Sequence, residues 1–158
     1  MMGQEYTLQP SPRGSVGALA SQVPGYLDGE WSPALTFDGV NTGITGSHSA
    51  LYTRIGQRLF YEFSILLTSK GAATGDVEIY NLPYGVWGTI SPGAIVWADL
   101  GDTFVYVSPI LETGALGGLC VKLLGAKAAS ASLGYLTNAD IANNTFLSIT
   151  GNYKILEG

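Results

Sequence analysis

The sequence contains few of the residues that metal sites and nucleophilic active sites require. Its 158 residues include one histidine, His48, and one cysteine, Cys120. One residue of each type cannot supply the ligands of a zinc-type site, and a lone cysteine cannot form an intrachain disulfide. Cys120 lies between Leu119 and Val121, where a small buried hydrophobic role is expected rather than a reactive thiol. The sequence therefore predicts no metal and no cofactor.

Charged residues are also scarce. They form 12% of the chain, against about a quarter in typical soluble proteins. The seven lysines and arginines are scattered as single residues, and the net charge is −5. Nucleic-acid binding needs a basic groove or stripe, so nucleic acid is not expected as a partner. A small domain with so few charges leaves apolar surface uncovered, and we expect part of it to lie against a partner or another copy.

Long apolar runs are absent. The chain has no stretch of about 18 apolar residues, the length of a transmembrane helix, so no membrane insertion is expected. It also has no charged N-terminal segment followed by an apolar one, so no secretory signal peptide is expected. The lack of an export signal suits a protein that is made and assembled in the cytoplasm.

The sequence also lacks the parts of an active site. Asp76 with Glu78, and Asp99 with Asp102, are the carboxylate pairs to consider for glycoside hydrolysis. Asp76 and Glu78 share one strand face, where polar residues are expected simply to face solvent, and 99–102 has the composition of a turn. His48 lies in a polar segment that is expected to be a loop, and no G-x-S-x-G motif accompanies it. We therefore expect that the protein is not an enzyme.

Alternation is the clearest positive signal in the chain. Between positions 59 and 67 every odd residue is large and apolar or aromatic: Leu59, Tyr61, Phe63, Ile65 and Leu67. A period of two predicts a strand with one face in a core, and the Gly56-Gln57 pair before it suits a two-residue hairpin. Further short apolar runs, at 77–80, 95–100, 103–107, 118–124 and 146–155, are separated by glycine and proline turns. One helical turn is expected over 138–144, because Asn138 can cap it. The sequence therefore predicts an all-β fold, an antiparallel, jelly-roll-like β-sandwich of about eight to ten strands.

The first residues differ from the remainder. Residues 1–29 have three prolines and no sustained periodicity, and the segment around Pro10 and Pro12 is expected to be extended. Apolar residues recur along it at Tyr6, Leu8, Val16, Leu19 and Tyr26. We expect an extended N-terminal arm over 1–29 that docks onto a neighbour through these residues, followed by a β-sandwich domain over 30–158. A disordered leader is the alternative.

An ordered set of short motifs resembles a known family. The segments at 31–39, 52–65, 68–75, 82–84 and 147–155, which include Trp-Ser-Pro, Tyr-Thr-Arg-Ile-Gly, Thr-Ser-Lys-Gly and Leu-Pro-Tyr, are similar to the β-sandwich domains at the C-terminal ends of tail fibres and tailspikes of tailed bacteriophages. The resemblance covers about residue 30 to the C-terminus. It implies a homotrimeric virion protein and brings no catalytic signature with it.

Two functions follow from the resemblance. Because the arm leads straight into the sandwich without a fibre shaft, we expect a short homotrimeric surface spike, a capsid decoration or tail accessory protein that docks on other virion proteins through its arm. The alternative is the tip of a tail fibre, a receptor-binding module that recognises host surface polysaccharide. In both cases the protein is expected at the virion surface after synthesis in the host cytoplasm.

Aromatic residues mark the candidate ligand site. Tyr80, Tyr84, Trp87 and Trp97 cluster in sequence around segments rich in glycine and proline. Exposed rings close to Asn and Asp side chains are typical of sugar-binding surfaces, because the rings stack on the apolar faces of sugars. The other interpretation is that the same rings fill the sandwich core or a subunit interface.

Overall fold

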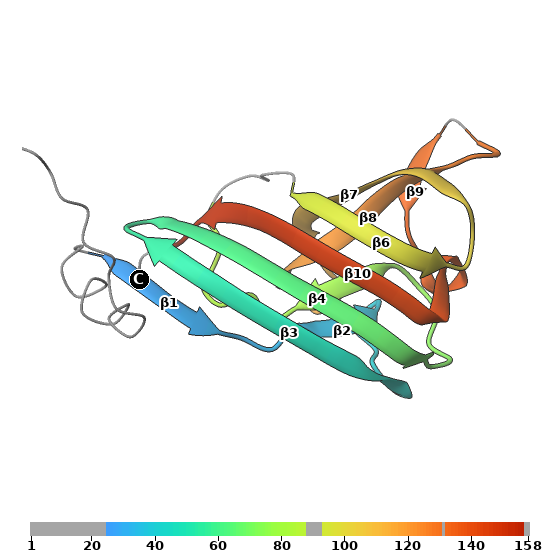
Figure 1. Ribbon diagram of the computed structural model, residues 1–158, viewed down its shortest axis with the longest axis horizontal. Coiled ribbons are helices and arrows are strands. Elements are labelled where there is room, and N and C mark those ends of the chain that lie inside the picture. Colours follow the sequence, from blue (N-terminus) through green and yellow to red (C-terminus); the bar gives the residue numbers. More distant parts are fainter. Residues whose placement is uncertain (1–24, 88–92, 131, 157–158) are drawn as a thin grey trace, which may run out of the picture.

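The chain folds into two facing antiparallel sheets (Figure 1). The computed structural model describes residues 25–87, 93–130 and 132–156, which contain ten strands, one short 3-10 helix and no α-helix. In chain order the elements are β1 (Tyr26–Glu30), β2 (Ala34–Phe37), β3 (Ile44–Ile55), β4 (Arg58–Lys70), β5 (Val77–Tyr80), β6 (Ala94–Leu100), β7 (Phe104–Thr113), β8 (Leu119–Lys127), β9 (Leu133–Tyr135), η1 (Asn138–Asp140) and β10 (Ile141–Lys154). The predicted fold class, an all-β sandwich, is confirmed.

Sheet A contains the longest strands and has the order β1-β3-β4-β10-β6. Its centre is the β3–β4 hairpin, in which Ile55 pairs with Arg58 across the predicted two-residue turn. Gly56 has a φ of +59°, a conformation that residues with a side chain rarely adopt and that tight hairpin turns require. The turn residue therefore sets the pairing register of both strands.

Sheet B has the order β2-β5-β8-β7, with β9 added against β8. All four residues of β5 are buried, although only one face of the strand packs against sheet A. Val77 and Ile79 belong to the core between the sheets, whereas Glu78 is buried on the opposite face. The expectation that Glu78 faces solvent is wrong, and the reason lies in the hydrogen bonds described below.

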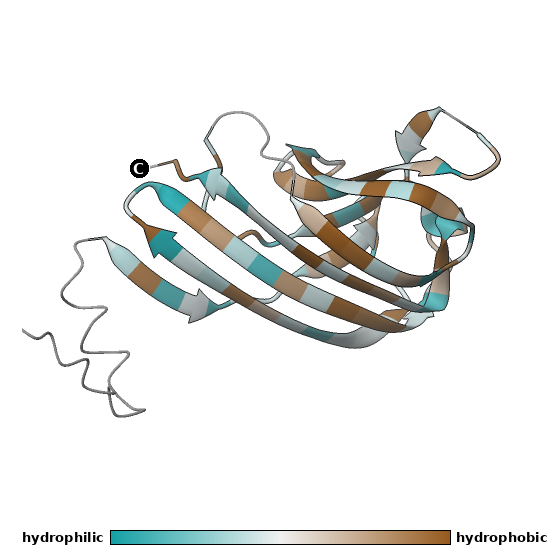
Figure 2. Ribbon diagram, turned by 45° about the horizontal axis from the view of Figure 1, so that its top comes forward, coloured by the Kyte–Doolittle hydropathy of each residue, from teal (hydrophilic) through white to brown (hydrophobic). Residues whose placement is uncertain are grey.

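The core lies between the sheets and follows the predicted alternation. Figure 2 shows apolar and polar segments alternating along the long strands of sheet A. The inward residues of β4 from Leu59 to Leu67 are at most 5% exposed. From β10, Leu147, Ile149 and Tyr153 enter the same cluster. Trp31 packs edge-on against Phe63, with ring centroids 5.4 Å apart, so it belongs to this core as well.

Three local predictions need correction. His48 lies in the middle of β3 rather than in a loop, because pairing with β4 holds its polar first half in the sheet. The helical turn expected over 138–144 is confined to η1, and β10 begins directly after it at Ile141. Tyr26 begins β1 and pairs with Ile55. The boundary expected between residues 29 and 30 therefore falls inside a strand of the sheet.

Candidate functional site

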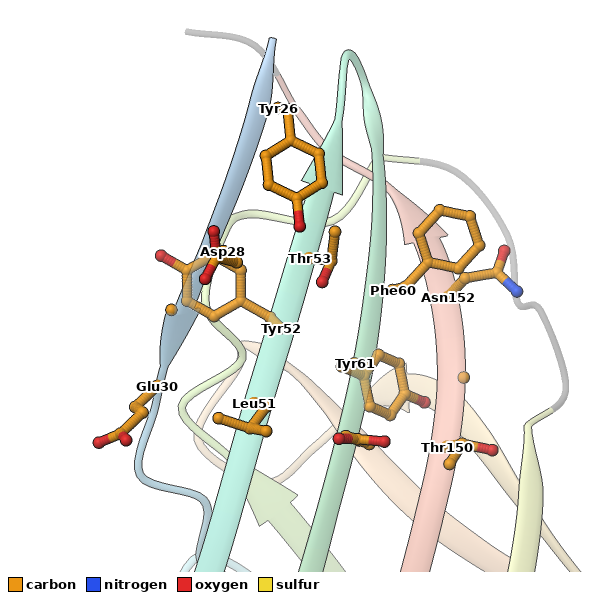
Figure 3. A pocket seen from close by; sticks show the side chains of 13 residues that line it. Tyr26, Asp28, Glu30, Leu51, Tyr52, Thr53, Phe60, Tyr61, Thr150 and Asn152 are labelled. Carbon is orange, nitrogen blue, oxygen red and sulfur yellow. The ribbon is translucent and has the colours of Figure 1, made fainter. Parts of the chain in front are cut away.

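A groove lies on the face of sheet A that points away from the core. It has a volume of about 670 Å³, within the range of small-molecule sites. Strands β1, β3, β4 and β10 supply its walls and floor (Figure 3). The lining residues are Tyr26, Asp28, Gly29, Glu30, Leu51, Tyr52, Thr53, Phe60, Tyr61, Glu62, Thr150, Gly151 and Asn152.

Strand register explains how residues that are distant in sequence meet there. Asp28 pairs with Thr53, Thr53 with Phe60, and Phe60 with Asn152, so these four residues form one row across the sheet. A second row runs in the same way from Glu30 through Leu51 and Glu62 to Thr150. Residues in register across a sheet point to the same side. Both rows alternate with the core residues of β4, and their side chains therefore point away from the core.

Between these rows lies an inward-facing row with a regular composition. Gly29 pairs with Tyr52, Tyr52 with Tyr61, and Tyr61 with Gly151. A Cβ atom on Gly29 would lie 2.8 Å from Cζ of Tyr52, and one on Gly151 would lie 2.5 Å from Oη of Tyr61. Each tyrosine ring thus covers the neighbouring glycine on the core side. The floor of the groove is backbone that is packed from beneath, so its shape is fixed by the core.

The groove combines aromatic rings with hydrogen-bonding groups. Phe60 is 45% exposed, and Figure 3 shows it and Tyr26 on opposite sides of Thr53. Among the described residues, the Arg58 guanidinium donates a hydrogen bond to Oδ1 of Asn152 at 3.0 Å. Because that bond uses the amide oxygen, the amide nitrogen of Asn152 stays available as a donor toward the groove.

Three carboxylates give the groove an acidic character. Asp28 and Glu30 come from β1 and Glu62 from β4, and all three are exposed. Within the described part of the chain, no ion pair and no side-chain hydrogen bond includes any of them. Their acceptor oxygens therefore remain free for a ligand.

The four aromatic residues predicted as a ligand site do not gather in one place. Tyr80 is buried on β5, where its hydroxyl donates to Glu78. Tyr84 packs edge-on against Tyr52 with ring centroids 5.8 Å apart. Trp97 lies on β6 and packs partly buried against the core. These three rings therefore pack within the domain, which is the second of the two interpretations given for them above.

Trp87 differs from the other three. It is 57% exposed, and Nζ of Lys154 lies 4.3 Å from the centre of its ring. Its backbone N–H donates to the carbonyl of Lys154 on β10. Lys154 is in register with Arg58, in the row next to Phe60. Trp87 therefore extends the outer surface of sheet A beside the groove without lining it.

Of the predicted arm residues, the structure describes one. Tyr26 lies on β1 and lines the groove, whereas Tyr6, Leu8, Val16 and Leu19 fall outside the described residues. The role expected for the arm stays a prediction.

Asp76 and Glu78, the first carboxylate pair considered for catalysis, form hydrogen bonds and ion pairs within the domain. Glu78 is completely buried. Its Oε2 accepts from the Tyr80 hydroxyl at 2.8 Å, and its Oε1 accepts from the Ala115 N–H at 2.9 Å. Burial raises the pKa of Glu78, but these two hydrogen bonds and the Lys122 ammonium outweigh burial and bring the pKa below its usual value. Lys122 also bridges to Asp76 at 3.3 Å.

The lone cysteine has no exposed thiol. Cys120 is fully buried as predicted, and burial raises the pKa of its thiol to about 11. In the described ranges, no group of three or more His, Cys, Asp or Glu side chains is placed to hold a metal ion. No helix in these ranges combines the length and the apolar character needed to cross a bilayer.

Comparison with known proteins identifies the fold. No protein-family model and no curated protein sequence matches the chain. A solved structure that matches is the Dettilon tailspike protein (gp208), with a TM-score of 0.60 and 15% sequence identity. The match covers 82% of this chain and 24% of the tailspike chain. The sandwich therefore has the fold of one part of a tailspike, which confirms the resemblance to tailspike domains predicted from the sequence motifs.

Proposed function

We propose that this protein is a non-catalytic component of a bacteriophage tail. The observation that carries the proposal is the fold shared with a tailspike protein over 82% of the chain. Head and tail positions were both expected from the sequence, and a tailspike relative favours the tail. The proposal includes synthesis in the host cytoplasm and a final location at the virion surface.

The proposal that the protein is non-catalytic is supported by where the candidate residues lie. Glu78 is enclosed by the tyrosine, amide and ammonium groups that it binds, so it has no access to a substrate. His48, another candidate, lies on β3 between Ser47 and Ser49, and serine neighbours on adjacent positions of a strand point to the opposite face. Among the residues that the structure describes, neither has a partner arranged for nucleophilic or acid–base chemistry.

A homotrimer is part of the proposal, and the uncharged half of the outer face of sheet A supports it. Beyond the groove, the outward rows consist of serine, alanine and apolar residues: Ser47, Ser49, Ser64, Leu66, Val96, Ala98, Phe146 and Ser148. Leu66 is 46% exposed and Val96 66% exposed. Contact between copies across this surface would cover the apolar area that the low charge content leaves open.

Attachment to the particle is assigned to residues 1–24, which precede β1. The sharpest test is a chain that begins at Gly25, because it removes the proposed arm and keeps β1 in sheet A. We expect full-length protein to bind phage particles that lack it, and the shortened chain to remain a trimer by light scattering but to lose particle binding. Equal particle binding by both chains would contradict attachment through the arm.

A second candidate function is recognition of the host surface. The groove on sheet A favours it, because exposed rings and free acceptors meet there on a rigid floor. Labelled full-length protein and the shortened chain are offered to host cells in parallel with the particles. Saturable cell binding that survives removal of residues 1–24 would support a receptor-binding role.

A further inference from the structure

We propose that the groove formed by β1, β3, β4 and β10 binds an uncharged saccharide. The inference extends the second candidate function, recognition of the host surface. It depends on that function only for the source of the saccharide. Phe60 and Tyr26 supply ring faces, and Asp28, Glu62 and Asn152 supply hydrogen bonds. This site differs from the aromatic cluster at 80–97 that the sequence indicates.

The aromatic part of the argument starts from exposure. A phenylalanine that is 45% exposed on the outer face of a sheet is costly in water unless a ligand or partner covers it. Tyr26 lies on β1 and Phe60 on β4, with β3 between them, which places the two rings about 10 Å apart across the sheet. That spacing holds two separate ring platforms along one extended ligand.

The polar part follows from the rows. Each row crossing the groove mixes apolar and polar side chains, with Phe60 between Thr53 and Asn152, and Leu51 between Glu30 and Glu62. Sugars have the same mixture, because apolar C–H faces alternate with hydroxyl groups at the ring edge. A carboxylate accepts hydroxyl protons through charge-assisted hydrogen bonds. An amide such as that of Asn152 can donate and accept at the same ring.

Charge decides the class of saccharide. Asp28, Glu30 and Glu62 line the groove without an ion pair in the described part of the chain. Two cations, Arg58 and Lys154, lie in the row beside the groove; Arg58 donates to Asn152 and Lys154 lies over the ring of Trp87. An acidic sugar would bring its negative charge against unneutralised carboxylates. The groove therefore selects against uronic or sialic acids and accepts neutral sugars.

The other class of ligand with affinity for carboxylates is a basic peptide. The rows favour a sugar, because the carboxylates are interleaved with Thr53, Thr150 and Asn152 rather than gathered in an acidic patch. The floor is also rigid backbone over packed tyrosines, which suits a small ligand that brings its own hydrogen-bonding pattern.

The test is a printed array of neutral, amino-substituted and acidic bacterial oligosaccharides, probed with labelled full-length protein, with oligolysine as an additional spot. We expect binding to neutral oligosaccharides, and Phe60→Ala should weaken it by about tenfold or more. Tyr106→Ala is the matched control, because Tyr106 is a 49% exposed aromatic residue on β7 of sheet B, outside the groove; it should bind as the unaltered protein does.

A second variant tests selection by charge. Asp28→Asn with Glu62→Gln keeps the shape of the groove and removes two negative charges, and we expect it to bind acidic oligosaccharides that the unaltered protein rejects. Binding to acidic sugars alone, to oligolysine alone, or to nothing on the array would overturn the proposal. Equal loss in Phe60→Ala and Tyr106→Ala would also overturn it. None of these outcomes depends on whether the protein is found on a phage tail.

Discussion

The hydroxyl of Tyr80 donates a 2.8 Å hydrogen bond to the fully buried carboxylate of Glu78, two positions earlier on β5. The same hydroxyl accepts from the N–H of Leu116 at 3.0 Å, and the carboxylate accepts from the N–H of Ala115. The pair thereby holds the β7–β8 loop over the outer face of sheet B. Glu78 is a structural residue, and its burial depends on all of these partners.

Replacement of the buried carboxylate should destabilise the domain. In Glu78→Gln the charge-assisted bonds to Tyr80 and Lys122 are weakened in a fully buried site. We expect the free energy of unfolding to fall by about 2–3 kcal/mol, as measured by urea denaturation. Glu62→Gln, on an exposed position of β4, is the control and should change it by less than about 0.5 kcal/mol. Equal effects of the two changes would contradict the network.

The lowered pKa of Glu78 predicts how the stability of the fold changes with pH. Since the folded carboxyl holds its proton less tightly than the unfolded one, the unfolded chain takes up a proton first as the pH falls. The stability supplied by Glu78 is complete above the ordinary glutamate pKa of about 4.3 and is lost as the pH drops through the folded value. The stability difference between the unaltered protein and Glu78→Gln should therefore shrink from neutral pH to about pH 3. A constant difference across that interval would refute the assignment.

Because tyrosine rings pack beneath the groove, we predict that Gly151 does not tolerate a side chain. Alanine at position 151 would place Cβ 2.5 Å from Oη of Tyr61, a ring that is 3% exposed and cannot swing aside. Gly151→Ala should cost about 1–3 kcal/mol of stability. Gly134, on β9, has nothing within 4 Å of the same position, and its change to alanine should be tolerated. Thermal denaturation of both variants checks the prediction, which fails if Gly151→Ala melts with the unaltered protein.

The two faces of β4 offer a direct comparison. Phe63 is 3% exposed and Phe60 45% exposed on the same strand. Phe63→Ala should lower the free energy of unfolding by about 3–5 kcal/mol through the cavity it leaves, whereas Phe60→Ala should change it by about 0.5 kcal/mol or less. Chemical denaturation measures both. Similar costs would mean that the inward and outward faces of β4 are assigned incorrectly.

The core of the fold could be predicted from the sequence because its signal is local. Alternating residues in β4 and at the end of β10 identify strands without any knowledge of their partners. The first half of β3 carries no such signal, since its serine, threonine and glycine residues have little preference for strands. Pairing with β4, from Ile44 against Lys70 onward, makes this segment a strand.

The groove could not be predicted because it depends on register between distant strands. Asp28, Thr53, Phe60 and Asn152 become one row only when β1, β3, β4 and β10 pair as they do. One local signal was present: Phe60 occupies an outward position of β4 between two charged outward residues, Arg58 and Glu62. The burial of Glu78 likewise depends on a loop 37 residues away in sequence.

The location of the protein on the phage particle tests the proposed function most directly. Antibodies raised against the purified protein, detected with gold in electron micrographs of intact particles, would show where it is carried. We predict label on the tail, and no label on particles produced without the protein. Label confined to the head, or equal background on both kinds of particle, would contradict the assignment to the tail.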